Sequence, residues 1–360
     1  MPLVTDNVGV PRVIDRFYAL DGLRFLAVLL VAAFHYCFVA GRDGFSAASI
    51  YPDVTRYMYL GVSLFFILSG FVIPYSGNNK SFKTFVILRG IRLYQAFWFC
   101  MLVTFIGATL LFADPRFTAT WRDVIFNTTM LPGFFGVRMV DGVYWTLLVE
   151  IKFYILFGLF LLVKKWLKFE WWLLAWMVVY SINQYIIPVP LSPLIAFHEG
   201  PLFMTGILLY MMVSEGISPS RLIALVAALF LAYGYELYQA TANAKNFGSA
   251  FEMKYIFPVV LLFCLGVWLA AKVSVPKWVR KLGDLTYPFY LLHDYLGLIL
   301  ISLFASILSP IGSITLVFIL MMLFAYGVNL YVEVPAQKSV KNYLGMTHGR
   351  RIASQDGASK

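Results

Sequence analysis

The chain alternates between long apolar stretches and short polar connections. Ten mostly apolar stretches are long enough to cross the ~30 Å hydrocarbon core of a bilayer as helices. They lie near residues 19–40, 57–76, 93–113, 143–163, 171–187, 194–213, 220–238, 255–272, 286–308 and 311–333. The apolar residues run continuously instead of alternating with polar ones, which predicts α-helices and not strands. The fifth stretch is short, and the sixth and ninth contain polar residues, so nine or eleven spans remain alternatives.

Composition places the chain among membrane proteins. Of its 360 residues, 61% are hydrophobic and 13% are charged, whereas a soluble chain averages about 45–50% apolar and ~25% charged residues. The net charge of +10 does not indicate nucleic-acid binding, because the basic residues lie between apolar stretches. Cys37, Cys100 and Cys264 all lie inside apolar stretches and indicate neither disulfides nor a metal site. We therefore predict an all-α, polytopic membrane protein of about ten transmembrane helices.

The distribution of lysine and arginine predicts the orientation of these helices. With ten spans, nineteen of the 28 basic residues fall on the side of the amino terminus and seven on the opposite side. Cytoplasmic loops carry the excess of basic residues, so both termini are predicted to be cytoplasmic. We expect residues 1–340 to form one integral membrane domain and residues 341–360 to form a polar, disordered cytoplasmic tail.

Two ionisable residues lie inside the first apolar stretch. Arg24 and His35 are eleven residues apart, which separates them by about 16 Å along one face of a helix. Such side chains cost several kcal/mol in a bilayer and usually face a polar cavity. Arg24 is also placed to extend to the membrane surface as an anchor. His35 is too deep for that, so it is the stronger functional candidate.

The other ionisable residues near the spans fall into two predicted layers. In the cytoplasmic layer, Arg89 and Arg92 are three residues apart on one helix face, where they would bind phosphate groups together with Arg24. The alternative is that they are ordinary basic residues beside a membrane end. His293 is also expected in this layer, where an interior hydrogen bond with Asp294 is as reasonable as a role in catalysis.

The outer layer holds a possible acid–base pair. His35 and Glu150 lie at similar predicted depths, so His35 would accept a proton from a hydroxyl while Glu150 orients the imidazole. Alternatively, Glu150 is a structural partner of Lys152 or a tyrosine. Two further residues, His198 and Glu199, either belong to this site or line a water-filled mouth.

Several motifs together resemble the acyltransferase-3 family of integral membrane acyltransferases. In chain order they are LDGLRFLAVLLVAAFHY, GVSLFFILSGFVI, FVILRGIRLYQAFW, VYWTLLVEIKFYILF, LTYPFYLLHDY and VEVPAQK, and they extend over almost the whole chain. Gln95 occupies an area where the family often has proline, which leaves Arg89 and Arg92 in place.

The resemblance implies an acyl-CoA-dependent O-acyltransferase in the bacterial inner membrane, without a metal. The acyl group, commonly acetyl, would pass from cytoplasmic acyl-CoA to a hydroxyl of a cell-surface carbohydrate, of O-antigen or exopolysaccharide type, or to its lipid-linked precursor. The CoA phosphates would bind Arg24, Arg89 and Arg92. His35 and Glu150 would be catalytic, and a covalent acyl-histidine intermediate is an alternative to direct transfer. The substrate pocket would contain Trp145, Tyr154, His198, Glu199 and His293.

Two other functions fit parts of this pattern. A transporter or flippase would use the buried residues as a relay, but it would predict repeated halves, which are not visible in the sequence. An acyltransferase acting on a small lipid or an antibiotic would share the donor site, and its acceptor specificity would lie in outer loops such as 114–142. We find no Walker, GxSxG, HExxH or paired CxxC motif.

Overall fold

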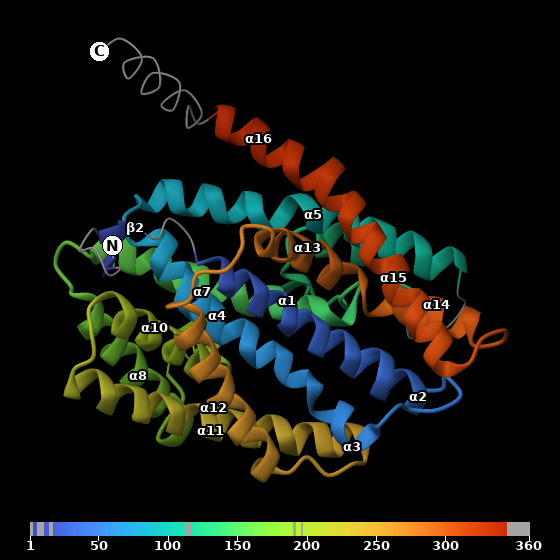
Figure 1. Ribbon diagram of the computed structural model, residues 1–360, viewed down its shortest axis with the longest axis horizontal. Helices are drawn as coiled ribbons and strands as arrows, with labels where there is room; N and C mark the ends of the chain where they lie inside the picture. Colours follow the sequence, from blue (N-terminus) through green and yellow to red (C-terminus); the bar gives the residue numbers. More distant parts are fainter. Residues whose placement is uncertain are drawn as a thin grey trace.

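The computed structural model describes residues 3–5, 11–13, 17–111, 117–189, 192–195 and 197–343. The first half comprises β1 (Leu3–Thr5), β2 (Pro11–Val13), α1 (Tyr18–Ala33), η1 (Phe34–Val39), α2 (Ala40–Arg42), α3 (Pro52–Thr55), η2 (Arg56–Leu60), α4 (Gly61–Gly77), α5 (Phe82–Leu111), α6 (Trp121–Asn127), η3 (Pro132–Phe135), η4 (Gly142–Tyr144) and α7 (Trp145–Val163). The second half comprises α8 (Phe169–Tyr185), α9 (Ser192–Ile195), α10 (Gly200–Ser214), α11 (Pro219–Phe247), α12 (Met253–Ala270), α13 (Val279–Leu292), α14 (Tyr295–Phe304), α15 (Pro310–Val328), η5 (Asn329–Glu333) and α16 (Val334–Tyr343) (Figure 1).

The prediction of an all-α, polytopic membrane protein is confirmed. Among the described residues, the strands are limited to the antiparallel pair β1–β2. Seven described helices are long and apolar enough to cross a bilayer, and the pair α13–α14, bent by 75°, would be an eighth. Helices α8 and α10, with 17 and 15 residues, are shorter than these, so the predicted count of ten spans is not established. Residues 344–360 of the predicted tail lie outside the described residues, and α16 includes the first three residues of that tail.

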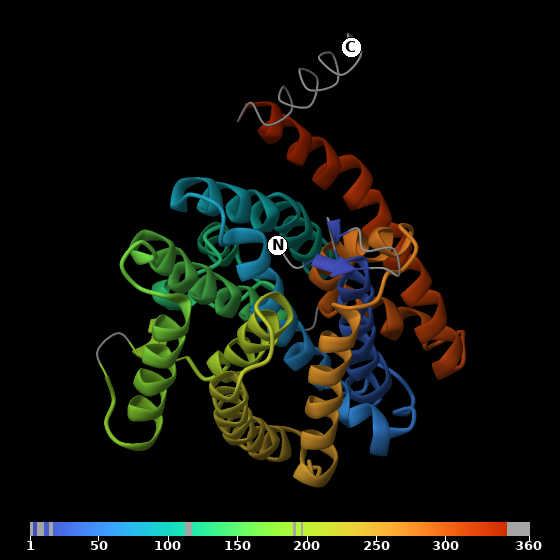
Figure 2. The ribbon, with the colours of Figure 1, turned by 60° about the vertical axis from the view of Figure 1, so that its left-hand side comes forward.

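The helices divide into a buried centre and an apolar periphery. In Figure 1, α5 lies along one edge and α11 and α12 along the opposite edge, with α1, α4 and α7 between them. In Figure 2, α8 and α15 lie on opposite flanks. At least half of the residues are buried in the spans that contain α1, α4 and α7, whereas fewer than a third are buried in α12 and α15. The outer helices therefore present their apolar side chains to lipid, and the polar residues of the centre are shielded from it.

Two glycines allow α4 and α10 to pack closely. A Cβ atom on Gly70 would overlap the carbonyl oxygen of Phe203, and one on Gly206 would overlap that of Ile67. Small residues at helix contacts are the usual means of close packing in membranes, where the hydrophobic effect does not drive helices together. This contact holds α4 in position behind the cavities described below.

Substitution of Gly206 by alanine is expected to lower stability by about 1–3 kcal/mol, because the added methyl group meets backbone that cannot move aside. Thermal unfolding of the detergent-purified protein, followed by size-exclusion chromatography after heating, measures this effect. The matched control is Gly266→Ala on α12, where a Cβ atom meets nothing within 4 Å. Equal unfolding temperatures for the two variants would contradict the importance of the α4–α10 contact.

Three irregularities interrupt the central helices. His35 lies within the π-helical segment η1, which continues α1. Glu333 ends a second π-helical segment, η5, which continues α15. Between α13 and α14 the chain bends at His293 and Asp294. Single π-helical turns occur frequently at functional sites, and each of these irregularities places an ionisable side chain in the interior.

Candidate active site

A cavity of about 560 Å³ occupies the end of the bundle at which α1 and α13 begin and α4 ends. We call it the basic cavity. The charged side chains that line it are Asp21, Arg24, Lys80, Arg89, Arg92, Arg280, Asp284 and Glu333. Basic groups outnumber acidic ones in this set, and the volume is in the usual range for small-molecule sites. The cavity is therefore suited to an anionic ligand.

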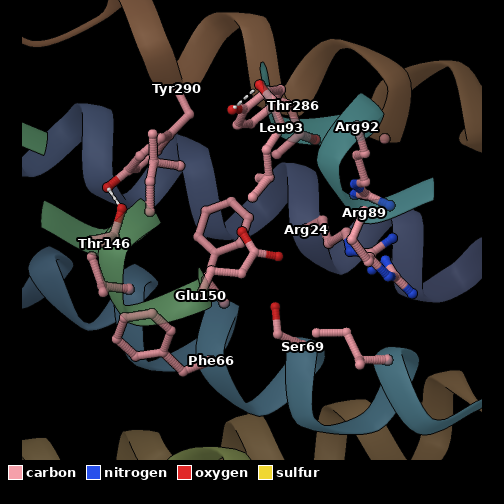
Figure 3. Close-up of a pocket in the computed structure, with 16 residues that line it drawn as sticks. Arg24, Phe66, Ser69, Arg89, Arg92, Leu93, Thr146, Glu150, Thr286 and Tyr290 are labelled. Carbon is pink, nitrogen blue, oxygen red and sulfur yellow. Dashed lines mark hydrogen bonds between the residues drawn. The ribbon is translucent and has the colours of Figure 1, made fainter. Parts of the chain in front are cut away.

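A smaller cavity of about 70 Å³ continues from it toward the middle of the bundle, and we call this the inner chamber. Arg24, Arg89 and Arg92 line both cavities and mark the boundary between them. Figure 3 shows the three guanidinium groups on one side of the chamber, with the carboxylate of Glu150 pointing into the space between them and Tyr290. The chamber thus has a cationic entrance and a single carboxylate inside.

The three arginines differ in their partners. Arg24 donates from Nη1 to Asp21 Oδ1 at 3.1 Å, which partly neutralises it. Arg89 hydrogen-bonds the hydroxyl of Ser76, and its guanidinium carbon lies 5.4 Å from the centre of the Tyr154 ring. In the described part of the chain, neither Arg89 nor Arg92 has a carboxylate within 4.0 Å. Two guanidinium groups therefore remain available to a ligand with negative charge.

A pair of histidines lies behind the inner chamber. Nδ1 of His35 is 3.1 Å from Nε2 of His293. The Nδ1 atom of His293 is 2.7 Å from the carbonyl oxygen of Tyr290. Tyr290 lines the chamber, and the centre of its ring lies 5.3 Å from the centre of the His293 ring. The histidine pair is thus separated from the chamber by the side chain of Tyr290, whose hydroxyl lies 2.8 Å from that of Thr146.

The hydrogen bonds fix the tautomers of both histidines when each ring is neutral. A carbonyl oxygen only accepts, so the proton of His293 is on Nδ1 and its Nε2 is an acceptor. His35 must then donate from Nδ1, which leaves its Nε2 with a free lone pair. His35 retains 16% of its side-chain exposure, whereas His293 is fully buried. Nε2 of His35 is therefore the basic nitrogen of the pair.

Two residues, Glu150 and His293, do not have the neighbours that the predicted layers gave them. Glu150 was expected beside His35, but it lines the inner chamber with the arginines and accepts a hydrogen bond from Tyr154. Within the described residues, no hydrogen bond or ion pair joins Glu150 to His35. His293 was expected in the cytoplasmic layer and instead contacts His35.

Helix length explains both errors. Helix α5 begins at Phe82 and not near residue 93, so Arg89 lies about 10 Å inside it and reaches the depth of Glu150. Helix α13 begins at Val279 and not near residue 286, which places His293 about 21 Å from the start of that helix. Helix α5 is also unbroken through Gln95.

The remaining predicted pocket residues are dispersed. The ring of Trp145 packs edge-to-face on Phe66, a lining residue of the inner chamber, without lining the chamber itself. His198 is exposed and stacks on Tyr238, and it lines neither cavity. Glu199 precedes α10 beside it and also lines neither cavity.

Sequence reasoning missed several residues around these sites. Tyr290 and Thr146 close the inner chamber toward the histidines. Asp141, a fully buried residue before η4, lies next to Asp294 at the bend. The only available signal was the position of Asp294 next to His293, because Asp141 belongs to an ordinary turn sequence.

Comparison with known proteins places this geometry in a family. A family model described as an acyltransferase domain matches residues 17–330. The chain belongs to the acyltransferase-3 family. The match extends from the residue before α1 into η5, so it contains the three arginines, Glu150 and the histidine pair.

Two of the three relatives of this acyltransferase-3 protein described next are named as acyltransferases. It is similar to acyltransferase MdmB of Streptomyces mycarofaciens, with 27% identity over 326 residues, which are 79% of each chain. It is 28% identical over 170 residues to the peptidoglycan O-acetyltransferase OatA of Listeria monocytogenes, covering 42% of this chain and 25% of OatA. Nodulation protein 10 of Rhizobium leguminosarum bv. viciae is 24% identical over 294 residues, covering 71% of this chain and 78% of that protein. The match with this chain thus spans a quarter of the length of OatA. No solved structure matches this chain.

Proposed function

We propose that this protein transfers an acyl group, in particular acetyl, from acyl-CoA to a hydroxyl of a cell-surface carbohydrate or its lipid-linked precursor. One observation carries the proposal. Arg89 and Arg92 have no carboxylate within 4.0 Å among the described residues, and they line a cavity that continues into a chamber ending beside a histidine pair with a free basic nitrogen. This arrangement provides a site for a phosphorylated donor at one end and a proton acceptor at the other.

The donor would occupy the basic cavity with its phosphates at Arg89 and Arg92 and with Arg24 at the chamber entrance. Its pantetheine arm would extend through the inner chamber past Glu150. Tyr290 and Thr146 close the chamber at the far side, so the thioester reaches His35 only when this pair moves apart. Lysine and arginine are most abundant at the predicted cytoplasmic side, which supports donor entry from the cytoplasm of a bacterial inner-membrane protein.

The reaction requires one proton transfer. Nε2 of His35 takes the proton of the acceptor hydroxyl while the oxygen forms a bond to the acyl carbon. The carbon–sulfur bond of the thioester breaks, and the departing thiolate receives the proton from His35. The products are the O-acyl ester and free CoA. His293 supports this role, because its hydrogen bond holds His35 in the tautomer with a free Nε2.

The acceptor class is inferred from relatives. OatA is named as a peptidoglycan O-acetyltransferase, and a putative peptidoglycan O-acetyltransferase, YrhL of Bacillus subtilis, is 27% identical over 167 residues. Both names point to carbohydrate hydroxyls in the cell envelope as acceptors. Mass spectrometry of surface carbohydrate from cells with and without the gene tests this part. Equal acylation of the carbohydrate, with a change confined to a small lipid or secreted product, would contradict it.

The reaction class is tested with purified protein in detergent, where no gradient exists across a membrane. Incubation with acetyl-CoA carrying a labelled acetyl group and with envelope carbohydrate is expected to yield labelled carbohydrate and free CoA in equal amounts. A transporter using the same residues as a relay would produce neither product. Absence of label in the carbohydrate and of CoA release would refute the proposed function.

A further inference from the structure

Two buried aspartates lie beside the histidine pair. Asp141 is fully buried and Asp294 is 6% exposed. Asp141 precedes η4 and accepts hydrogen bonds from the backbone N–H groups of Val143 at 3.1 Å and Tyr295 at 3.3 Å. Asp294 forms the bend between α13 and α14. The turn before α7 and the break in the α13–α14 span are thereby joined.

The two carboxyl groups lie side by side, because the N–H group of Tyr295, the residue after Asp294, donates to Oδ2 of Asp141. Two adjacent carboxylates buried together do not both ionise, because their repulsion is not screened by water. The pair therefore carries one negative charge, and the two backbone N–H groups hold Asp141 in place beside Asp294. Gly142 allows this approach, since a Cβ atom there would lie 2.8 Å from Asp294 Oδ2.

The acid pair faces the basic nitrogen of His35. Asp294 Oδ1 lies 3.8 Å from Nε2 of His35, the atom left with a free lone pair by the hydrogen bonds of the two histidines. A proton taken up at Nε2 would therefore lie next to the negative charge of the pair. Glu150, the carboxylate expected in this role, is in the inner chamber.

We propose that Asp294 is the carboxylate that stabilises the protonated form of His35 during acyl transfer, and that Asp141 positions Asp294. This inference rests on the proposed acyltransfer at His35. When His35 removes the proton of the acceptor hydroxyl, its imidazolium pairs with Asp294 until the proton passes to the thiolate of CoA. The aspartates gain and lose no proton over the cycle, so they act as positioning residues and not as the base.

Other titratable groups lie on the elements near His35. On η1 and on the elements packed against it or against the bend, the titratable groups are Tyr36 and Cys37 of η1, Arg42 of α2, Asp53 of α3, Arg56, Tyr57 and Tyr59 of η2, His293 and Asp294 at the bend, Tyr295 of α14, and Asp141. His293 is held as a donor to a carbonyl oxygen and contacts the other nitrogen of His35. Among these groups, Asp294 is the carboxylate that lies within 4.0 Å of Nε2, so its removal should change the pH dependence of the reaction directly.

The test is Asp294→Asn, which preserves shape and removes the carboxylate that faces His35. Acyl transfer at saturating acetyl-CoA is expected to fall roughly 100-fold or more, with an unchanged KM for acetyl-CoA. The midpoint of the acid side of the pH–rate profile is expected to move to lower pH, because the imidazolium loses its carboxylate. A purely structural role would lower the rate without moving that midpoint. The control Asp53→Asn removes a carboxylate that is 90% exposed on α3, and it should change neither quantity.

Gly142→Ala provides a second variant that retains both aspartates. Its methyl group displaces Asp294 and should lower the rate by a smaller factor than Asp294→Asn. Acetyl-CoA binding measured by calorimetry verifies that each variant is folded. An Asp294→Asn protein with the wild-type rate, or with a lower rate at an unmoved midpoint, would overturn the role of the acid pair. A wild-type protein that transfers no acetyl group would instead refute the acyltransferase proposal itself.

Discussion

Replacement of His35 by alanine is expected to lower acyl transfer by roughly 100- to 10,000-fold while acetyl-CoA binding remains at the wild-type level. His35 Nε2 is the free basic nitrogen of the histidine pair, whereas the arginines that line the basic cavity are separate from it. Transfer of labelled acetyl groups to carbohydrate by purified protein measures the rate, and calorimetry measures donor binding. A variant that retains the wild-type rate would show that the proton acceptor is another group.

Two further variants separate proton acceptance from packing. His35→Gln retains a side-chain N–H that can donate to His293 but has no basic nitrogen, so it should be as inactive as the alanine variant. Cys37→Ala changes a half-buried residue of the same π-helical segment and should remain active. Rapid acid quenching without acceptor then distinguishes the two routes of transfer, because label bound to protein indicates an acyl-histidine intermediate.

Replacement of both Arg89 and Arg92 by alanine is expected to raise the KM for acetyl-CoA by roughly 100-fold or more. Each arginine would make charge-assisted hydrogen bonds worth about 1.5–3 kcal/mol with donor phosphates. Both guanidinium groups lack a carboxylate within 4.0 Å among the described residues, so a ligand phosphate does not have to displace an ion pair. Initial rates over a range of acetyl-CoA concentrations give the KM.

A donor without phosphates makes this experiment specific. Wild-type protein should prefer acetyl-CoA strongly over acetyl-pantetheine, and the double variant should lose most of this preference. Lys83→Ala removes an exposed basic residue in the first turn of α5 that lines neither cavity, and it should leave the preference intact. If the double variant still prefers acetyl-CoA as strongly as the wild type, the phosphates bind elsewhere.

The presence of the helices could be predicted from the hydropathy of the sequence, whereas their exact ends could not. All ten apolar stretches contain helix, and the polar residues between them mark most connections. Helix ends were less accurate, because segments such as VRKLGDLT begin α13 although they are too polar for a hydrocarbon core. Hydropathy locates the membrane, whereas backbone hydrogen bonds determine where a helix begins. The depths of Arg89 and His293 were wrong for this reason.

The site could be predicted only in part. Arg24 was found because it is an ionisable residue inside an apolar stretch, and Arg89 and Arg92 were found because they are three residues apart on one helix face. All three do line the same cavities. The contact between His35 and His293 joins residues 258 positions apart and depends on the bend after α13. The sequence at that bend, HDY, contains neither glycine nor proline, so these residues do not predict the bend.

The connection that supplies Asp141 limits how this protein can be engineered. The side-chain amide of Asn127 donates to the carbonyl oxygen of Arg138 at 2.8 Å and accepts from the N–H of Val140 at 3.2 Å, so the end of the connection is fixed just before Asp141. Grafting a relative's loop to alter acceptor choice would therefore have to preserve Asn127 and the segment 138–144. Grafts confined to residues 128–137 would leave Asp141 in its position beside Asp294. A library of variants restricted to those ten positions would therefore test acceptor choice while the rate of acyl transfer is retained.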